Sequence, residues 1–227
     1  MIERFIDVEV LAPSPIDGRA MLRQIEAAGR TCYKSENRVS DGSAVPFVRM
    51  LLQRGHESVI EHVSLSVRMV VPRGVSHEIV RHRLASYSQE STRYCNYRGE
   101  VEFIRPWHLE DLQSDDYHRW RSHMLACERE YQNAIDRGWS PEMARGLLPI
   151  DLKTEIVMTA NLREWRHFFR LRASRAAHPQ MVYAACCLLR LLRIQIPVIF
   201  DDVGDLEAQD FAMRRRPKQV VEKEQRA

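Results

Sequence analysis

The stretch VSLSVRMVV at residues 63–71 is the clearest strand in this sequence. Apolar side chains stand at every second position, and serine or arginine fills most of the positions between them. This period of two predicts a strand with one face buried in a core and the other face nearer to solvent. Pro72 and Gly74 follow, and both residue types are typical of the end of a strand.

Helical spacing of apolar residues predominates in the rest of the chain. Before residue 63 we expect a strand that contains Ile6, Val8 and Val10, and a helix that Ser14 caps and that runs to about Arg30. A polar loop over residues 35–43 and a second helix that ends near Gly55 should follow. After Pro72 we expect helices capped by Ser76, Ser114, Ser140 and Asn161, a strand at residues 101–104, and a buried helix over residues 181–196. The helix from Ser76 should run to about Leu84 and be followed by a loop. Residues 153–160 fit a strand or a helix, because their β-branched side chains suit either period.

Length and composition favour one globular domain. The 227 residues are 44% hydrophobic and 29% charged, which is ordinary for a folded protein with a sizeable core. The last residues are rich in charge, so we expect a domain at residues 1–210 and a flexible tail at residues 211–227. The net charge of +3, from 34 basic and 31 acidic side chains, does not favour a nucleic-acid binder.

Cysteine usage and hydropathy indicate a cytoplasmic protein. The five cysteines form no CxxC pair, and their odd number is not typical of a secreted disulfide framework. The first residues lack the basic and apolar stretches of a signal peptide. No window contains the ~18 apolar residues of a membrane span. We therefore expect a reduced protein without a membrane partner.

The segment RHRLASYSQESTRY at residues 81–94 has the strongest chemical character. It combines three arginines with a histidine and several hydroxyl groups. Arginine offers a planar set of donors that suits phosphate or carboxylate, and hydroxyl and backbone N–H groups complete such anion sites. The segment is a candidate site for a phosphorylated ligand. A solvated helix end explains its composition more simply, and both interpretations stay open at this point.

Two further segments contain possible ligand residues. The run HESVIEH at residues 56–62 suggests a metal site, but its second histidine comes two residues too late for the metalloprotease pattern. We expect no metal there, and a capping or cofactor-contacting histidine instead. Arg145 stands among apolar residues near a helix end, where its side chain either extends to solvent or binds a ligand.

The helix that begins after Asn161 contains four arginines. Arg163, Arg166 and Arg170 form a stripe opposite the aromatic residues, and solvation explains these three. Arg172 comes where the helix should end, which suits a ligand contact. Neither GxGxxG nor GxxxxGK[ST] is present, and nothing near Cys95 marks it as a nucleophile.

These segments, in this order, resemble the flavin-dependent thymidylate synthases. The signature of that family is Arg-His-Arg, seven residues and then Ser, and here it runs from Arg81 to Ser91. The neighbouring segments of the family match the run at residues 56–62, Ala144-Arg145 before Leu-Pro, and Asn161 with Leu171-Arg172. The matching segments span about residues 32–180, which is most of the chain.

The resemblance implies an α+β fold, here a single domain in which a small, mostly antiparallel sheet packs with several long helices. It implies a homotetramer whose active sites are shared between subunits, with FAD as cofactor and dUMP, methylenetetrahydrofolate and NADPH as substrates. The residues that should contact FAD are His56, Ser58, Arg81, His82, Arg83, Gln89, Asn161, Arg163 and His167. Those that should contact dUMP are Glu78, Arg81, Gln89, Glu90, Ser91, Thr92, Arg93, Arg145 and Arg172.

Arg172 has a special place in this resemblance. It matches the arginine that polarises the uracil ring, so it is the candidate catalytic residue, and no cysteine nucleophile is required. Gln89, His167 and Glu78 stand where the family often has glutamate, asparagine and glutamine.

Two other interpretations are possible. The first is a small nucleic-acid-binding module that uses residues 81–93 and 214–216, whose binding would weaken steeply with salt. The second is a flavoprotein relative that has lost methylation, against which the presence of Arg145 and Arg172 argues.

Overall fold

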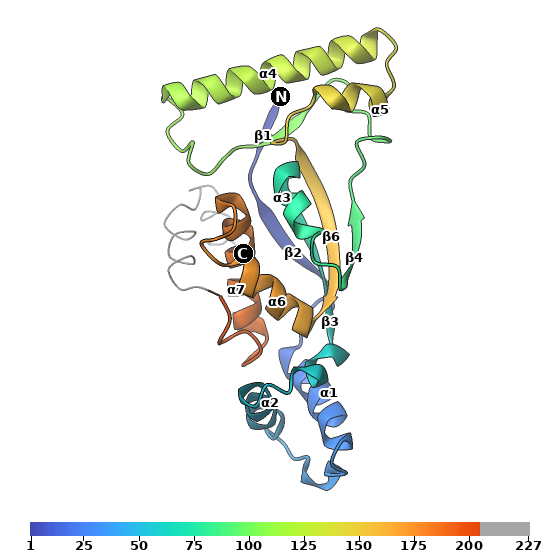
Figure 1. Cartoon of the computed structure of the whole chain (residues 1–227), viewed down its shortest axis with the longest axis vertical. Helices are drawn as coiled ribbons and strands as arrows, with labels where there is room; N and C mark the ends of the chain where they lie inside the picture. The colour runs from blue at the N-terminus through green and yellow to red at the C-terminus, as the bar shows by residue number, and fades with distance from the viewer. Residues whose placement is uncertain (205–227) are drawn as a thin grey trace.

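A four-stranded antiparallel sheet forms the centre of the molecule, with strand order β2-β3-β6-β4 (Figure 1). The computed structural model describes residues 1–204. The strands are β2 (Asp7–Ala12), β3 (Ser64–Pro72), β4 (Ala85–Gln89) and β6 (Lys153–Asn161). β3 and β6 pair along their whole lengths, and their side chains alternate between buried and partly exposed positions. The strand predicted at residues 63–71 is confirmed, and the ambiguous segment at 153–160 is also a strand.

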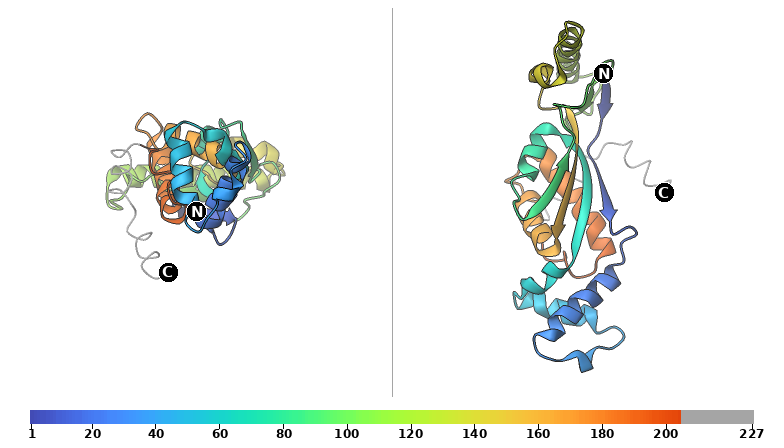
Figure 2. Two further views of the ribbon diagram at one scale, coloured as in Figure 1. Left: turned by 90° about the horizontal axis from the view of Figure 1, so that it is seen from below. Right: turned by 90° about the vertical axis from the view of Figure 1, so that its right-hand side faces the viewer.

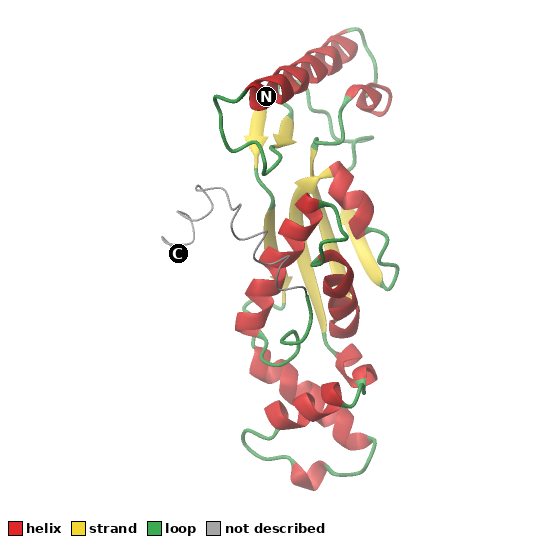
Figure 3. Ribbon diagram, turned by 60° about the vertical axis from the view of Figure 1, so that its left-hand side comes forward, coloured by secondary structure: helices red, strands yellow, loops and turns green. Residues whose placement is uncertain are grey.

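Three helices cover one face of this sheet (Figure 3). They are α3 (Arg73–Ile79), α6 (Leu162–Arg172) and α7 (Pro179–Gln195). Their apolar side chains meet the buried face of β3 in the main core of the protein. The opposite face of β3 is more polar, and Arg68 there lies 2.6 Å from Glu9 and 3.2 Å from Glu155. Within residues 1–204 the sheet is therefore packed on one side only, as period-two alternation predicts.

Both predicted boundaries of the helix before the arginine-rich segment are wrong. We expected a helix that Ser76 caps and that runs to Leu84, followed by a loop. Instead α3 begins at Arg73, after the capping residue Pro72, and ends at Ile79, and the loop residues form β4. Tyr87 of β4 explains the early end, since its hydroxyl donates to the carbonyl oxygens of Ile79 and His82 at 2.9 and 2.6 Å. Both carbonyls therefore have a partner outside the helix.

The N- and C-terminal helices meet closely at one end of the sheet. α1 (Gly18–Thr31) begins after Asp17, whose carboxylate accepts from the N–H of Ala20 at 2.9 Å. The prediction that Ser14 caps this helix is wrong, because Asp17 supplies the cap instead. Its charged carboxylate lies three residues before the N–H of Ala20, to which it is a hydrogen-bond acceptor. A Cβ at Gly18 would lie 2.0 Å from the carbonyl oxygen of Gln195, so only glycine fits where α1 meets α7.

The two ends of the elongated molecule carry the remaining elements (Figure 2). At one end lie α1, η1 (Glu36–Arg38), α2 (Ala44–Gln53) and η2 (Glu57–His62). At the other end β1 (Ile2–Arg4) pairs in parallel with β5 (Glu102–Ile104), beside α4 (Asp115–Asp136), α5 (Pro141–Ala144) and η3 (Arg145–Leu147). A second, smaller core lies at this end.

Two predicted helix caps and the fold class are confirmed, and one predicted helix start is wrong. Ser114 caps α4 through the N–H of Tyr117, and Asn161 caps α6 through the N–H of Glu164, as predicted. The last helix begins at Pro179, two residues earlier than expected, because proline suits the first helical position. The α+β fold class is confirmed. The expected tail at residues 211–227 lies outside the described residues, as does the basic run Arg214–Arg216.

Within residues 1–204, no helix combines the length and the apolar character that a membrane span needs.

Candidate functional site

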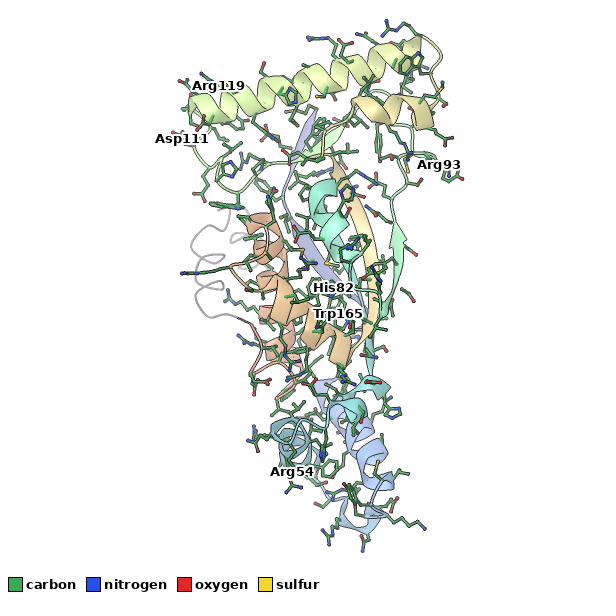
Figure 4. All side chains as sticks on the ribbon, viewed as in Figure 1. Arg54, His82, Arg93, Asp111, Arg119 and Trp165 are labelled. Atoms are coloured by element: carbon green, nitrogen blue, oxygen red, sulfur yellow. The ribbon has the colours of Figure 1, made fainter. Side chains whose placement is uncertain are left out.

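His82 lies at the centre of the site, buried between α6 and the turn that follows α3. Figure 4 shows it beside Trp165 of α6 in the middle of the molecule. Its ring centroid is 5.0 Å from that of Phe168 and 5.5 Å from that of His167. Tyr87 fixes the turn through the two carbonyl contacts described above. Burial raises the pKa of Tyr87 to about 12, so its hydroxyl stays a donor at neutral pH.

Arg172 connects this histidine to α3. Its Nε donates to Nε2 of His82 at 3.1 Å, its Nη1 donates to the carboxylate of Glu78 at 2.7 Å, and its Nη2 donates to the backbone carbonyl of Glu78 at 3.1 Å. All three nitrogens of the guanidinium group therefore have a fixed partner. The structure thus brings together Arg172 and Glu78, two of the residues assigned to dUMP, although they are far apart in sequence.

Glu164 is a buried carboxyl group that the sequence analysis did not select. Its Oε1 lies 3.3 Å from Nδ1 of His82. Burial, with contributions from Arg172 and His167, lowers the pKa of His82 to about 4, and burial raises the pKa of Glu164. His82 is therefore neutral at pH 7, and its contact with Glu164 is a hydrogen bond rather than an ion pair.

The same side chains form a possible metal-binding group. Potential ligand atoms of His82, Glu164 and His167 lie within 4.8 Å of one another, and no other such trio occurs in residues 1–204. The fixed positive charge of Arg172, 3.1 Å from His82, opposes a second cation here. The segment at residues 56–62 forms no such trio, because Glu57 and Glu61 face arginines instead.

A cleft of about 760 Å³ opens beside His82. Six of the nine residues assigned to FAD line it: Arg81, His82, Arg83, Asn161, Arg163 and His167. Arg163 and Arg170 are neutralised by Glu61 and Glu57. Arg81 and Arg83 are exposed, and within residues 1–204 neither side chain has an acidic partner. The cleft therefore offers two uncompensated positive charges.

Three residues assigned to FAD do not line the cleft. His56 lies directly before η2 and Ser58 lies within it, and both residues are exposed. Gln89 points under α3, where its amide donates to the hydroxyls of Ser76 and Thr154 at 2.8 and 3.2 Å. Its side chain links β4 to α3 and β6, so within one chain it has a structural role.

A second, smaller hollow of about 300 Å³ contains two residues assigned to dUMP. Arg145 of η3 and Thr92 line it together with Arg73 and His77 of α3. Arg145 is exposed and has no acidic partner in the part of the chain that the structure describes. This hollow shares no lining residue with the cleft.

The loop between β4 and β5 is held by the side chain of Glu90. This carboxylate accepts from the hydroxyl of Tyr97 at 2.7 Å, from Nζ of Lys153 at 3.2 Å and from the N–H of Glu155 at 3.2 Å. Burial and the contact with Glu90 raise the pKa of Tyr97. Glu90 therefore points into the protein, and within one chain it fixes the conformation of residues 91–97.

The other two loop residues assigned to dUMP lie near the surface. Ser91 accepts from the N–H of Arg93 at 3.3 Å, and Arg93 pairs with Glu142 of α5 at 2.9 Å (Figure 4). Within one chain, the residues assigned to dUMP thus fall into separate groups: Glu78 with Arg172, Thr92 with Arg145, and an exposed Arg93.

Arg166 contradicts its prediction as a solvated residue. Its side chain is 1% exposed, and it donates to both carboxylate oxygens of Asp202, to Glu57 and to the carbonyl of Ile199. The helical stripe was placed correctly, but residues 197–203 and η2 fold over it at this position. No pattern local to α6 could reveal that cover.

Comparisons with known proteins identify relatives of this chain. The family model described as "Thymidylate synthase complementing protein" (Thy1) matches residues 19–198, which include every residue of the candidate site. A flavin-dependent thymidylate synthase from Geobacter sulfurreducens is 35% identical over 190 residues, covering 79% of this chain and 81% of that protein. One from Mycolicibacterium gilvum is 35% identical over 204 residues, covering 82% and 80%.

A solved structure is similar as well. It is a UMP/dUMP methylase, PolB, from Streptomyces cacaoi, bound with 5-Br dUMP. The TM-score is 0.73 at 26% identity, and the match covers 88% of this chain and 96% of that chain. The similarity therefore extends over both the sheet and the helices that carry the site.

Proposed function

This chain belongs to the family of flavin-dependent thymidylate synthases, and from this premise we propose that it methylates dUMP to dTMP, with methylenetetrahydrofolate as carbon donor and NADPH as reductant through FAD. The observation that carries the proposal is the cleft beside His82. Its two uncompensated arginines, Arg81 and Arg83, lie next to the position where Arg172 is fixed.

The charge of the cleft suits FAD. The diphosphate of FAD is an anion, and arginines without acidic partners provide charge-assisted hydrogen bonds to such a group. Arg81 and Arg83 would hold the diphosphate, while Asn161 and His167 offer polar contacts along the wall. When bound, FAD supplies the redox chemistry that turns the transferred carbon into a methyl group.

Arg172 would act on the pyrimidine ring. Methylation at C5 of uracil requires electron density at that carbon, and a fixed cation near the ring stabilises the negative charge that develops. The three contacts of Arg172 hold its guanidinium in one orientation before substrate arrives. None of the five cysteines lines the cleft or the hollow, which supports a route without a cysteine nucleophile.

Flavin binding and tritium release test this function. The full-length protein should bind FAD, and it should release tritium from C5-labelled dUMP when NADPH and methylenetetrahydrofolate are both present. Arg81→Ala should weaken FAD binding about 10- to 100-fold, because one charge-assisted contact is lost. Arg98→Ala is the matched control, since Arg98 is an exposed arginine paired with Asp136 and away from the cleft.

Two outcomes would contradict the proposal: a protein that binds no flavin after reconstitution, or tritium release that needs no reductant. The same assay with C5-labelled UMP separates the two nucleotides, since the similar methylase PolB is named for both. Binding to DNA that weakens steeply with salt would instead support the nucleic-acid-binding interpretation.

We also propose a homotetramer in which subunits share each active site. Support comes from the separation within one chain of Arg145, in the hollow, from Arg172, beside the cleft. Two adjacent residues of α3 contact the two sites separately: His77 lines the hollow with Arg145, and Glu78 binds Arg172. One dUMP could thus meet Arg145 of one copy and Arg172 of another.

Mixing two inactive variants tests this sharing. Arg145→Ala and Arg172→Ala should each be inactive alone. Tetramers assembled from both chains should recover up to about a quarter of the wild-type activity, because some sites then combine the intact residue of each chain. A mixture that stays inactive, although mass spectrometry shows mixed tetramers, would place both residues in the site from one chain.

A further inference from the structure

We propose that Glu164 is a positioning residue, which selects the tautomer of His82 and through it fixes the orientation of Arg172. The inference rests on the role proposed above for Arg172, but its structural part is independent of that role. It starts from three buried or half-buried groups that touch in series: Glu164, His82 and Arg172.

The contact with Arg172 decides which nitrogen of His82 is protonated. An arginine Nε–H is only a donor, and it has no lone pair with which to accept. Nε2 of His82, 3.1 Å away, must therefore present its own lone pair. Since the ring is neutral at pH 7, the single ring proton resides on Nδ1.

Glu164 accepts a hydrogen bond from the N–H at Nδ1 of His82. Its Oε1 lies 3.3 Å from Nδ1, and both side chains are buried. The other tautomer would place an N–H of His82 against the N–H of Arg172, and a lone pair against the carboxyl group of Glu164. The contact with Arg172 would then be repulsive, and so would the contact with an ionised Glu164, so the two neighbours select the same tautomer.

This selection affects the guanidinium of Arg172 directly. With Nε bound to His82, and with Nη1 and Nη2 each bound to Glu78, the plane of the group is defined at three points. Nη1 and Nη2 each keep one further N–H for a ligand. Loss of the Nε contact would leave only the two contacts with Glu78 to hold the group.

The position of Glu164 in the sequence makes its orientation unusual. It is the third residue of α6 after the cap Asn161, where a glutamate usually accepts from the N–H of the capping residue. Here Asn161 also ends β6, where it pairs with Ser64 of β3, and the carboxyl group of Glu164 lies against His82 instead.

Histidine NMR on the full-length, FAD-reconstituted protein tests the tautomer. In ¹⁵N-histidine-labelled protein at pH 7, the His82 signals should show a protonated Nδ1 and an unprotonated Nε2. His82→Gln identifies these signals by their disappearance among those of the nine histidines. A protonated Nε2, or a doubly protonated ring, would overturn the proposal. This arm needs no variant of Glu164 and no activity.

Substitutions of Glu164 test its positioning role. Glu164→Gln keeps an acceptor oxygen, so it should retain the tautomer and most of the turnover per bound FAD. Glu164→Leu removes the acceptor, so the His82 signals should change and kcat for dUMP should fall about 10-fold or more, the size typical for loss of a group that orients an active-site histidine. The KM for dUMP should change less.

Glu26→Gln is the control, because Glu26 is equally buried but contacts Arg30 and Ser43 in another part of the protein. It should leave the His82 signals and kcat unchanged.

If Glu164→Leu also leaves both unchanged, Glu164 has no positioning role. Binding of one equivalent of Zn²⁺ that changes the ring nitrogen signals of both His82 and His167 would also overturn the proposal, because the metal needs the lone pair of Nδ1. Absence of dUMP turnover with the expected tautomer would refute the proposed function and leave the tautomer assignment intact.

Discussion

Arg172→Ala is expected to lower the rate of dUMP methylation by about 10²–10³-fold, the usual effect of removing a group that stabilises charge in a transition state. The expectation follows from its geometry, since each of its three nitrogens is held by His82 or Glu78 before any ligand arrives. FAD should stay bound, because Arg81 and Arg83, and not Arg172, line the cleft. Flavin absorbance after desalting and tritium release from labelled dUMP measure the two effects separately.

A conservative change sharpens this prediction. Arg172→Lys keeps the charge but has one ammonium group, which cannot repeat three contacts in a plane. It should therefore recover little of the lost rate. Arg98→Ala, which removes an exposed arginine away from the site, should have close to the wild-type rate. A near-normal rate in Arg172→Ala would remove Arg172 from the mechanism.

Arg166→Ala should have the largest effect on stability, a loss of about 3 kcal/mol in the free energy of unfolding. The side chain is 1% exposed and binds Asp202, Glu57 and the carbonyl of Ile199. Alanine removes this partner from Asp202 and from the carbonyl, while Glu57 keeps its contact with Arg170. We place the value at the lower end of the range for a broken buried pair, because Asp202 is 60% exposed and water can solvate it.

Arg163→Ala is the matched control on the same helix. Arg163 is 52% exposed and pairs with Glu61 at the surface, so its loss should lower the free energy of unfolding far less than the loss of Arg166. Urea unfolding of both variants at one protein concentration tests the difference. Equal midpoints for the two variants would show that the buried contacts of Arg166 contribute no more than a surface pair.

Much of the fold could be predicted because its causes are local. The alternation at residues 63–71 identifies β3, since each apolar side chain needs the same buried face. Ser114 and Asn161 begin α4 and α6 because each places an oxygen near an N–H three residues ahead. Gly55 ends α2 with a positive φ of 72°, which glycine adopts without strain.

The errors and the open alternative occurred where distant residues decide the local structure. Residues 153–160 became a strand because β3 and β4 pair with them on both sides. Helix α3 ends early where Tyr87, from the next strand, binds the carbonyls of Ile79 and His82. Hydrogen bonds of this kind join residues from separate elements, so a sequence window contains no sign of them.

By itself, the sequence determined the family, the arginine-rich chemistry of residues 81–94 and the place of Arg172 at the end of its helix. These follow from residue types in a fixed order, which the chain displays without folding. Only the tertiary structure decided that Arg166 is buried, that Glu164 faces His82, and that Glu90 and Gln89 point inward. Helical periodicity gives the direction of a side chain, but burial depends on which other segment covers that direction, and packing of distant segments determines that cover.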